Sequence, residues 1–216
     1  MNPKCRICGS ETEPIHHPRS GVFYHCSSCE FISKSKDDII SHVDELKIYS
    51  THENSIDDPR YVEYFYNFLD EAVFPFVKGE IHGLDFGSGP SPVLAQILKR
   101  DQNYEMDIYD FFYAPDKVYL SKRYDLIVCT EVVEHLSDPM AYFKLFKQLL
   151  KPEGILAIMT LFHNNDRAYF MDWHYARDLS HISFYTPKTL ALIASKVGLK
   201  IIHTNNVRFI TFILDK

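Results

Sequence analysis

A glycine-rich turn is the first feature of this 216-residue chain that could carry chemistry. An apolar run over residues 81–86 leads into it, and residues 91–100 follow with apolar side chains at helical spacing. The turn contains Asp85, Gly87, Ser88 and Gly89. Glycines let the backbone approach a ligand closely, and the free N–H groups at a helix start favour anionic or nucleotide groups. This order of strand, turn and helix predicts a nucleotide-like cofactor, although such glycines also serve ordinary turns.

Four of the five cysteines form two Cys-x-x-Cys pairs, Cys5 with Cys8 and Cys26 with Cys29. The spacing is typical of a structural zinc site, in which four thiolates complete a tetrahedron and leave no open position. Two disulfides are the alternative, and a reducing compartment disfavours them. Three histidines could replace a cysteine as ligand, but we expect them on the surface of this segment: His16, His17 and His25.

Several ordered motifs together resemble the class I S-adenosylmethionine-dependent methyltransferases. They are Leu84-Asp-Phe-Gly-Ser-Gly89, Tyr124-Asp-Leu-Ile-Val-Cys-Thr130, Glu134-His-Leu136 and Leu150-Lys-Pro-Glu-Gly-Ile-Leu156. The resemblance spans residues 58–214 and implies an α/β fold with a doubly wound, mostly parallel sheet of the Rossmann-like type. It also implies S-adenosylmethionine as cofactor. Asp85, Gly87, Ser88 and Gly89 would surround its methionine part, and Thr130 and Glu131 would face its sulfur end.

The chain departs from this family at Pro90-Ser91-Pro92, which replaces the usual third glycine. The two prolines stiffen the turn and remove two backbone donors, and Pro92 is tolerated in the first helical turn. A carboxylate after the next strand is expected to accept hydrogen bonds from the ribose hydroxyls. Asp110 closes that strand and is favoured, because ligands bind beyond the carboxyl ends of parallel strands. Asp107, in the middle of the strand, is the alternative.

Methyl transfer from a sulfonium requires alignment of the reacting atoms, exclusion of water and removal of the acceptor's proton. The candidates for this catalytic work are Glu131, His135 and His181. A structural role is the alternative for each histidine. Glu131, Glu134, His135 and His181 also resemble the metal set of the small-RNA terminal 2′-O-methyltransferases, and such ligands would suit Mg²⁺ or Mn²⁺. The same motif is common in metal-free methyltransferases, so this possibility stays open.

The chain is expected to divide into a zinc-knuckle domain (1–33), a polar connector (34–58) and a methyltransferase domain (59–216). A helix start is expected at Asp37 and Asp38, and an amphipathic helix from Pro59 to Val73. The fifth cysteine, Cys129, is expected to be a small buried hydrophobe. Strands are expected at 81–86, 104–109, 124–130, 153–161, 199–204 and 207–214, and helices at 91–100, 138–150 and 186–197.

Only residues 111–123 separate the second strand of this domain from the third. This length is too short for a helix, a strand and another helix, so we expect the sheet to lack one strand of the family. The acid that usually follows that strand and binds adenine is then absent, with Asp116 as a possible stand-in. Residues 161–184 are rich in aromatic side chains, which could line a substrate pocket, form a packed lid or form a dimer face.

The net charge of −6 is spread evenly, with 7 basic and 10 acidic residues up to Arg60 and 16 and 19 after it. No basic excess favours a phosphate backbone, so nucleic acid is disfavoured as a partner. No apolar stretch reaches about 18 residues, and the N-terminus lacks the apolar core of a signal peptide, so we expect no membrane insertion and a cytoplasmic location.

The function best supported by these observations is S-adenosylmethionine-dependent methyl transfer to a small-molecule acceptor, either a metabolite, a sugar or a lipid-like compound. A structural Zn²⁺ and a homodimer are further expectations. One alternative is an RNA or protein methyltransferase whose zinc finger presents the macromolecule. Another is a non-catalytic interaction module that retains the fold.

Overall fold

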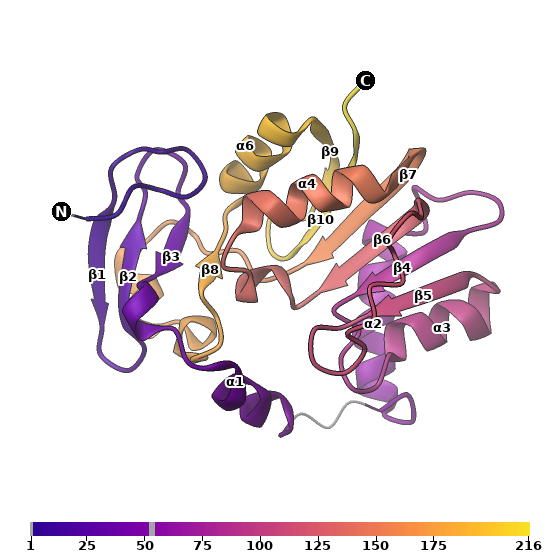
Figure 1. The fold of residues 1–216 in the computed structure, drawn as a ribbon, viewed down its shortest axis with the longest axis horizontal. Coiled ribbons are helices and arrows are strands. Elements are labelled where there is room, and N and C mark those ends of the chain that lie inside the picture. Colours follow the sequence, from indigo (N-terminus) through magenta and orange to yellow (C-terminus); the bar gives the residue numbers. More distant parts are fainter. Residues whose placement is uncertain (1, 52–54) are drawn as a thin grey trace.

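Two β-sheets organise the computed structural model, which describes residues 2–51 and 55–216 (Figure 1). The large sheet has the strand order β5-β4-β6-β7-β10-β9, and the small sheet has the order β1-β2-β3-β8. The strands of the large sheet are β4 (His82–Phe86), β5 (Glu105–Tyr109), β6 (Tyr124–Thr130), β7 (Leu150–Met159), β9 (Leu199–Thr204) and β10 (Phe209–Leu214). Those of the small sheet are β1 (Glu13–His17), β2 (Gly21–His25), β3 (Ile32–Lys34) and β8 (Ser183–Phe184).

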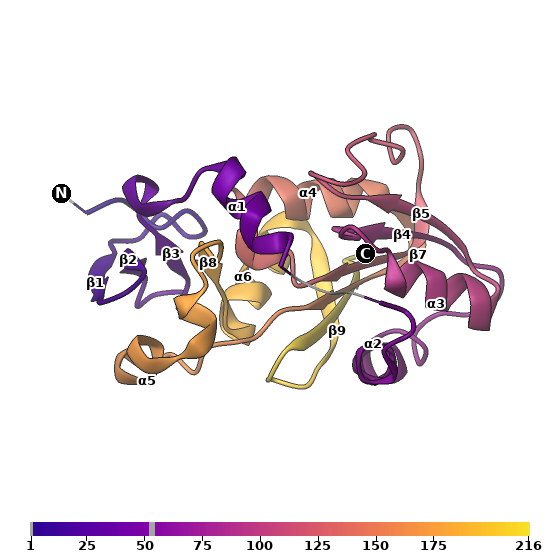
Figure 2. The same ribbon diagram turned by 90° about the horizontal axis from the view of Figure 1, so that it is seen from below.

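Helices cover both faces of the large sheet, as the alternation of elements predicts (Figures 1 and 2). One face packs against α2 (Pro59–Ala72) and α3 (Val93–Gln102), and the other against α4 (Pro139–Leu149) and α6 (Pro187–Val197). The remaining helices are α1 (His42–Tyr49), α5 (Arg167–Asp172) and the short turns η1 (Lys36–Asp38), η2 (Val133–His135) and η3 (His174–Arg177). This architecture confirms the predicted α/β fold class.

The parallel strands at the centre of the sheet position the functional residues. β4 pairs in parallel with both β5 and β6, and β6 pairs in parallel with β7. Their carboxyl ends therefore lie at one edge of the sheet, where α/β proteins bind ligands. β6 is apolar and largely buried because helices cover both faces, and Cys129 is fully buried within it, as predicted.

Local sequence signals set the helix ends. α2 begins after Asp58, whose side chain accepts a hydrogen bond from Arg60 N, and its buried face is Phe65, Phe68, Leu69 and Ala72. α6 begins with a reciprocal capping box between Thr186 and Thr189, and it ends at Gly198 in a left-handed conformation. These signals explain why the observed bounds lie within three residues of most predicted ones.

The starts of two elements, β7 and the helix that follows the small-sheet strand β3, differ from their predicted positions for reasons that the structure explains. β7 starts at Leu150 rather than at residue 153, because Tyr124 pairs with Leu150 across a register shift in β6. Asp37 and Asp38 form only a single turn of 3₁₀-helix, so the predicted helix start there is wrong. The helix of this segment, α1, begins later, after Ser41, which accepts a hydrogen bond from Asp44 N. Residues 52–54 of the predicted connector lie outside the described residues.

The large sheet lacks a strand beyond β5, as the short spacing predicts. Residues 111–123 form turns, with one isolated bridge between Asp110 and Ala114, and β5 is the edge of the described sheet. Asp116, the possible stand-in for the adenine-binding acid, is exposed on this loop and is not among the residues that line the cavity described below. No helix among the described residues is long and apolar enough to cross a membrane.

The aromatic segment 161–184 packs against the cysteine-bearing end of the molecule. Phe170, Trp173 and Phe184 are buried in one core with Ile15 and Phe23. Strand β8 of this segment also completes the small sheet by pairing antiparallel with β3. These rings therefore fill an internal core between distant parts of the chain, a role that the sequence interpretation did not include.

Candidate functional site

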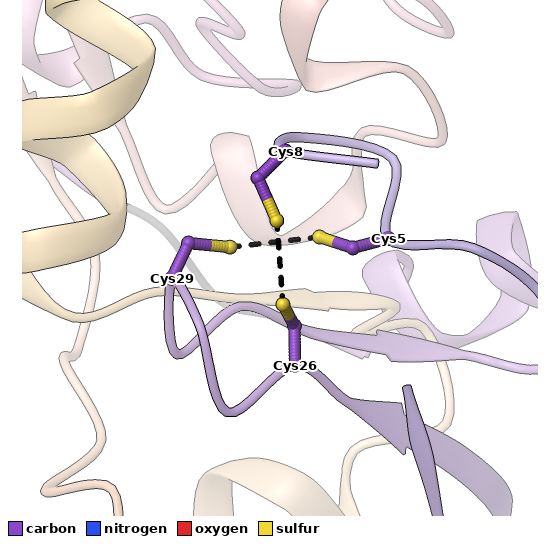
Figure 3. A group of neighbouring side chains, drawn as sticks. All are labelled: Cys5, Cys8, Cys26 and Cys29. Carbon is purple, nitrogen blue, oxygen red and sulfur yellow. Dashed lines mark hydrogen bonds between the residues drawn. The ribbon is translucent and has the colours of Figure 1, made fainter. Parts of the chain in front are cut away.

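The four paired cysteines meet in one group at the N-terminal end (Figure 3). Cys5 Sγ lies 3.5 Å from Cys29 Sγ, and Cys8 Sγ lies 3.4 Å from Cys26 Sγ. All four are free thiols, and these separations exceed the roughly 2.05 Å of a disulfide. A tetrahedral zinc with bonds of about 2.3 Å would separate its sulfurs by about 3.8 Å, so a small outward shift accommodates it. The donor set fits a structural zinc ion.

The backbone of the two knuckles has the same form. In the first, Gly9 N donates to Cys5 O, and in the second, Glu30 N donates to Cys26 O. Gly9 and Glu30, one residue after each second cysteine, both adopt positive φ angles, of 80° and 66°. The hydrogen bond between Cys5 and Cys29 lowers the pKa of Cys5 and raises that of Cys29, so it favours one thiolate in this pair.

The neighbouring histidines are engaged elsewhere. His25 Nε2 lies 2.8 Å from Asn165 Oδ1, and His17 Nδ1 accepts a hydrogen bond from Ser20 N. The prediction that all three histidines lie on the surface is wrong for His17, which is buried against Phe23 and Phe170.

A cavity of about 820 Å³ opens at the carboxyl ends of β4, β5 and β6. This volume suits a cofactor together with part of a small acceptor. The predicted cofactor residues all line it, and so do the three predicted catalytic residues: Asp85, Gly87, Ser88, Gly89, Asp110, Thr130, Glu131, His135 and His181. The structure thus brings together, around one cavity, residues that lie up to about 96 positions apart in the sequence.

The glycine turn forms the cavity wall between β4 and α3. Gly87 and Gly89 have φ angles of 87° and 66°, which side chains disfavour. A Cβ added at Gly87 would lie only 2.1 Å from Val132 Cγ2, so this position also needs glycine for space. Ser88 Oγ is buried without a protein partner among the described residues, and it could serve a ligand. Burial raises the pKa of Asp85 to about 7.

The two candidate ribose acids lie in different surroundings. Asp110 lines the cavity, where its carboxylate accepts hydrogen bonds from Gly89 N and Phe112 N. Asp107 is outside the cavity lining and pairs with Lys122 Nζ at 2.7 Å and Tyr124 Oη at 2.7 Å. These contacts lower the pKa of Asp107 against the opposing effect of burial, as expected for a structural carboxylate. The position of Asp110 in the cavity lining therefore favours it over Asp107 as the carboxylate for the ribose hydroxyls.

Glu131 stands at the other end of the cavity, directly after β6, with a φ angle of 53°. Tyr64 of α2 donates to Glu131 Oε1 at 2.8 Å, and Tyr175 of η3 donates to Glu131 Oε2 at 2.8 Å. Arg208 lies 3.5 Å from the same carboxylate. Glu131 is thereby oriented by groups from three separate parts of the chain, α2, η3 and the bend before β10, which leaves little freedom for its side chain.

His135 and His181 lie beside this carboxylate, with ring centres 4.8 Å apart. His135 Nδ1 lies 3.0 Å from Ser180 O, and His181 Nδ1 lies 2.8 Å from Tyr175 O. A carbonyl oxygen only accepts, so each Nδ1 carries the hydrogen and each neutral Nε2 keeps a lone pair. Burial lowers the pKa of His181 to about 3 and lowers that of His135 as well. Both rings are therefore neutral near pH 7, as a base requires.

Glu134 is fully buried beneath the two rings. Its Oε1 lies within hydrogen-bonding distance of Tyr175 Oη, so Glu131 and Glu134 share the single hydroxyl hydrogen of Tyr175. Glu134 Oε1 also lies 4.0 Å from His135 Nε2, whereas Glu134 Oε2 has no protein partner in the described structure. Burial raises the pKa of Glu134 well above its usual value. Glu134, His135 and His181 place their ligand atoms within 4.8 Å of one another, so three of the four residues in the metal hypothesis come together.

The sequence interpretation missed several residues of the cavity lining, among them Arg60, Tyr64 and Asp178. It included Tyr175 only as one ring of the aromatic segment and did not predict its contact with Glu131. Tyr64 belongs to the amphipathic helix α2. Its ring stacks with that of Tyr61, one turn earlier, and this pair is the only sign that this face of the helix has a function. Tyr175 and Asp178 lie in a segment without periodicity. No local signal separates them from the aromatic residues that fill the adjacent core.

The family model described as "Methyltransferase domain" matches residues 60–204 of the chain. Curated relatives include ubiquinone biosynthesis O-methyltransferases from several bacteria. The one from Dinoroseobacter shibae is 31% identical over 55% of this chain and 50% of its own length. The one from Aeromonas salmonicida is 25% identical over 60% of this chain and 57% of its own length. The chain thus spans about half the length of these relatives.

Solved structures with a similar fold are also methyltransferases. The mitomycin 7-O-methyltransferase aligns with a TM-score of 0.51 at 14% identity, over 80% of this chain and 67% of that one. An O-methyltransferase family protein from Burkholderia thailandensis aligns with a TM-score of 0.52 at 14% identity, over 80% and 63%. The chain belongs to the methyltransferase-domain family over residues 60–204, and it carries the fold of the class I S-adenosylmethionine-dependent methyltransferases.

Proposed function

We propose that this chain transfers the methyl group of S-adenosylmethionine to a hydroxyl group of a small-molecule acceptor. The observation that carries the proposal is the pair of neutral histidines, His135 and His181, whose unprotonated Nε2 atoms lie at the cavity beside Glu131. A hydroxyl must lose a proton as it is methylated, and a neutral imidazole within reach can take it. The matching relatives are named as O-methyltransferases, which supports an oxygen acceptor.

The residues of the glycine turn fit the cofactor. When bound, S-adenosylmethionine supplies an activated methyl group on a sulfonium. Gly87 and Gly89 would allow its close approach, Asp110 would accept from the ribose hydroxyls, and Arg60 would pair with the carboxylate of its methionine part. Glu131, held by Tyr64 and Tyr175, would give the sulfonium region a fixed negative neighbour.

The charge of the cavity supports a small uncharged acceptor rather than RNA. Six carboxylates line it: Glu45, Asp58, Asp85, Asp110, Glu131 and Asp178. Arg60 is the one lysine or arginine in the described lining, and its partner is Asp58. Such a surface repels a phosphate backbone. A neutral phenol, catechol or polyol meets no such penalty.

Zinc is part of the proposal, and a second ion is an alternative to the histidine base. Zn²⁺ would be held by Cys5, Cys8, Cys26 and Cys29 as a structural ion. As the alternative to a histidine base, a divalent cation would be held by Glu134, His135 and His181, which place ligand atoms within 4.8 Å of one another; Glu134 Oε2 has no partner among the described residues. In that case the histidines act as ligands and not as bases, and an acceptor with two adjacent hydroxyls is favoured.

The test is methyl transfer from isotope-labelled S-adenosylmethionine to a panel of catechols, phenols, polyols, RNA and peptides. We expect labelled product with hydroxylated small molecules only. His181→Ala should lower kcat by about 10²-fold with little change in the KM of the cofactor. His16→Ala, at an exposed finger position outside the cavity, is the control.

Each reaction is run with and without added Mg²⁺ or Mn²⁺, which separates a base from a metal ligand. Labelled RNA or peptide, with no labelled small molecule, would overturn the assignment of the acceptor. A chain that binds neither S-adenosylmethionine nor S-adenosylhomocysteine in calorimetry would overturn the enzymatic assignment altogether.

A further inference from the structure

We infer that the second cysteine knuckle positions the acceptor end of the active site, so that the metal-bound finger is a working part of that site and not a separate module. The finger here means residues 2–34, and the acceptor end means Glu131, Glu134, His135 and His181. The inference concerns this chain's contacts between the two. The inference goes beyond the proposed methyl transfer. Only the test by turnover rests on that proposed function.

The first contact is a shared sheet. β3 of the finger pairs antiparallel with β8, with Ile32 opposite Phe184 and Ser33 opposite Ser183, and Lys34 N donates to Ile182 O (Figure 2). β8 begins two residues after His181. Backbone hydrogen bonds to the finger therefore fix the chain on the carboxyl side of His181.

The second contact is made by the knuckle turn itself. Glu30, directly after Cys29, accepts from Thr186 Oγ1 at 2.9 Å and from Lys188 Nζ at 3.1 Å. Thr189 Oγ1 donates to Cys29 O at 2.8 Å. Thr186 and Thr189 form the capping box of α6, so the cysteine turn holds the start of that helix at its cap.

The third contact links β8 and the first knuckle to the turn that carries Glu134 and His135. Ile182 N donates to Glu134 O at 2.8 Å, and Ser183 Oγ donates to Leu136 O at 2.7 Å. Arg6, between the two cysteines of the first knuckle, donates to Ser137 O at 2.9 Å. Both sides of the acceptor end are thus tied to the finger within one or two hydrogen bonds.

The packing shows the same continuity. Cys5, Cys26, Cys29 and Phe31 belong to one buried cluster with residues of α4, α6 and the large sheet, Tyr185 among them. The cofactor end has other supports: Gly87 N donates to Tyr109 O, and Gly89 N to Asp110. Loss of zinc should therefore disturb His135 and His181 while leaving the cofactor end in place.

The experiment compares the zinc-loaded full chain with the same chain after chelation under reducing conditions, with metal loss checked by elemental analysis. Trp173, the single tryptophan, belongs to residues 161–184 and is buried in one core with Ile15 and Phe23 of the finger, so its fluorescence reports the packing of the two segments. We expect its emission to shift to longer wavelength and the Kd for S-adenosylhomocysteine to change by less than about threefold. Turnover should fall by roughly tenfold or more.

Substitutions in the loaded chain test the knuckle without removing the metal. Glu30→Ala should lower kcat roughly threefold to tenfold with the KM of S-adenosylmethionine unchanged, and Glu30→Gln, which still accepts from Thr186, should restore most of it. Glu11→Ala is the matched control, because Glu11 is an exposed finger carboxylate whose partner is Lys4.

Three results would overturn the inference. They are unchanged Trp173 emission in the metal-free chain, unchanged turnover in the metal-free chain, and simultaneous loss of cofactor binding, which would mean general unfolding. If no methyl acceptor is ever found, the proposed function fails alone. The coupling is then judged by Trp173 emission and by the ring NMR signals of His135 and His181, which Glu30→Ala should shift and Glu11→Ala should not.

Discussion

Substitution of Gly87 by alanine should destabilise the chain for two separable reasons. Gly87 has a φ angle of 87°, and a left-handed conformation costs a residue with a Cβ about 1–2 kcal/mol. The added Cβ would lie 2.1 Å from Val132 Cγ2, and such overpacking costs about 1–3 kcal/mol more. The free energy of unfolding should therefore fall by about 2–5 kcal/mol.

Gly79 provides the matched control. Its φ angle is 79°, yet a Cβ there would meet no atom within 4 Å. Gly79→Ala should thus lose only the conformational part, about 1–2 kcal/mol. Denaturant unfolding of Gly87→Ala, Val132→Ala and the double variant forms a cycle, and the double variant should recover part of the loss because the clashing methyl group is gone.

The same variants separate fold from cofactor binding. Gly87 lines the cavity and Gly79 does not, so Gly87→Ala alone should weaken S-adenosylhomocysteine binding in calorimetry. Equal destabilisation by Gly87→Ala and Gly79→Ala, or strict additivity in the cycle with Val132, would refute the steric argument. The turn would then tolerate a side chain, and its glycines would be needed for conformation only.

Two further predictions concern titratable groups. Asp110→Asn should weaken S-adenosylhomocysteine binding in calorimetry by roughly tenfold or more. Asp107→Asn breaks the contacts with Lys122 and Tyr124, so it should lower stability in denaturant unfolding with little change in affinity. The reverse pattern would exchange the roles of the two residues. The pKa of His181 is lowered in the folded chain to about 3, so the unfolded chain binds the extra proton and His181 makes the chain less stable as pH falls below about 6.5. The stability of the wild type relative to His181→Gln should therefore drop by about 2 kcal/mol between pH 7 and pH 5, and a difference that is constant with pH would show that His181 titrates normally.

Much of the large sheet could be predicted from the sequence because its signals are local. The apolar run of residues 124–130, the glycine turn at Gly87 and the capping box at Thr186 each act within a few residues. Even the missing strand follows from a local count, since residues 111–123 leave no room for it. The register shift that starts β7 at Leu150 depends on pairing with Tyr124 and could not be read locally.

The grouping of the predicted cofactor residues around one cavity was predictable for the same reason. Asp85, Gly87, Ser88 and Gly89 lie on one turn, and their motif fixes their position at the carboxyl end of β4. At the acceptor end, the motif around Glu131 and His135 also marked a site. The residues that orient Glu131 carry no such sequence signal. Tyr64 of α2 contacts Glu131 across 67 positions of sequence, and Tyr175 of η3 contacts it across 44.

The acceptor end is therefore a product of long-range contacts, and further long-range contacts join the segments beside it to the finger. Thr186 meets Glu30 across 156 positions, and Thr189 meets Cys29 across 160. No apolar period or capping signal within either segment specifies such a pairing; it depends on burying Phe23, Phe170 and Phe184 together. Because a base or a metal ligand must be held within fractions of an ångström, the proposed zinc site at Cys26 and Cys29 would have a physical reason to lie next to the residues that we propose take the acceptor's proton.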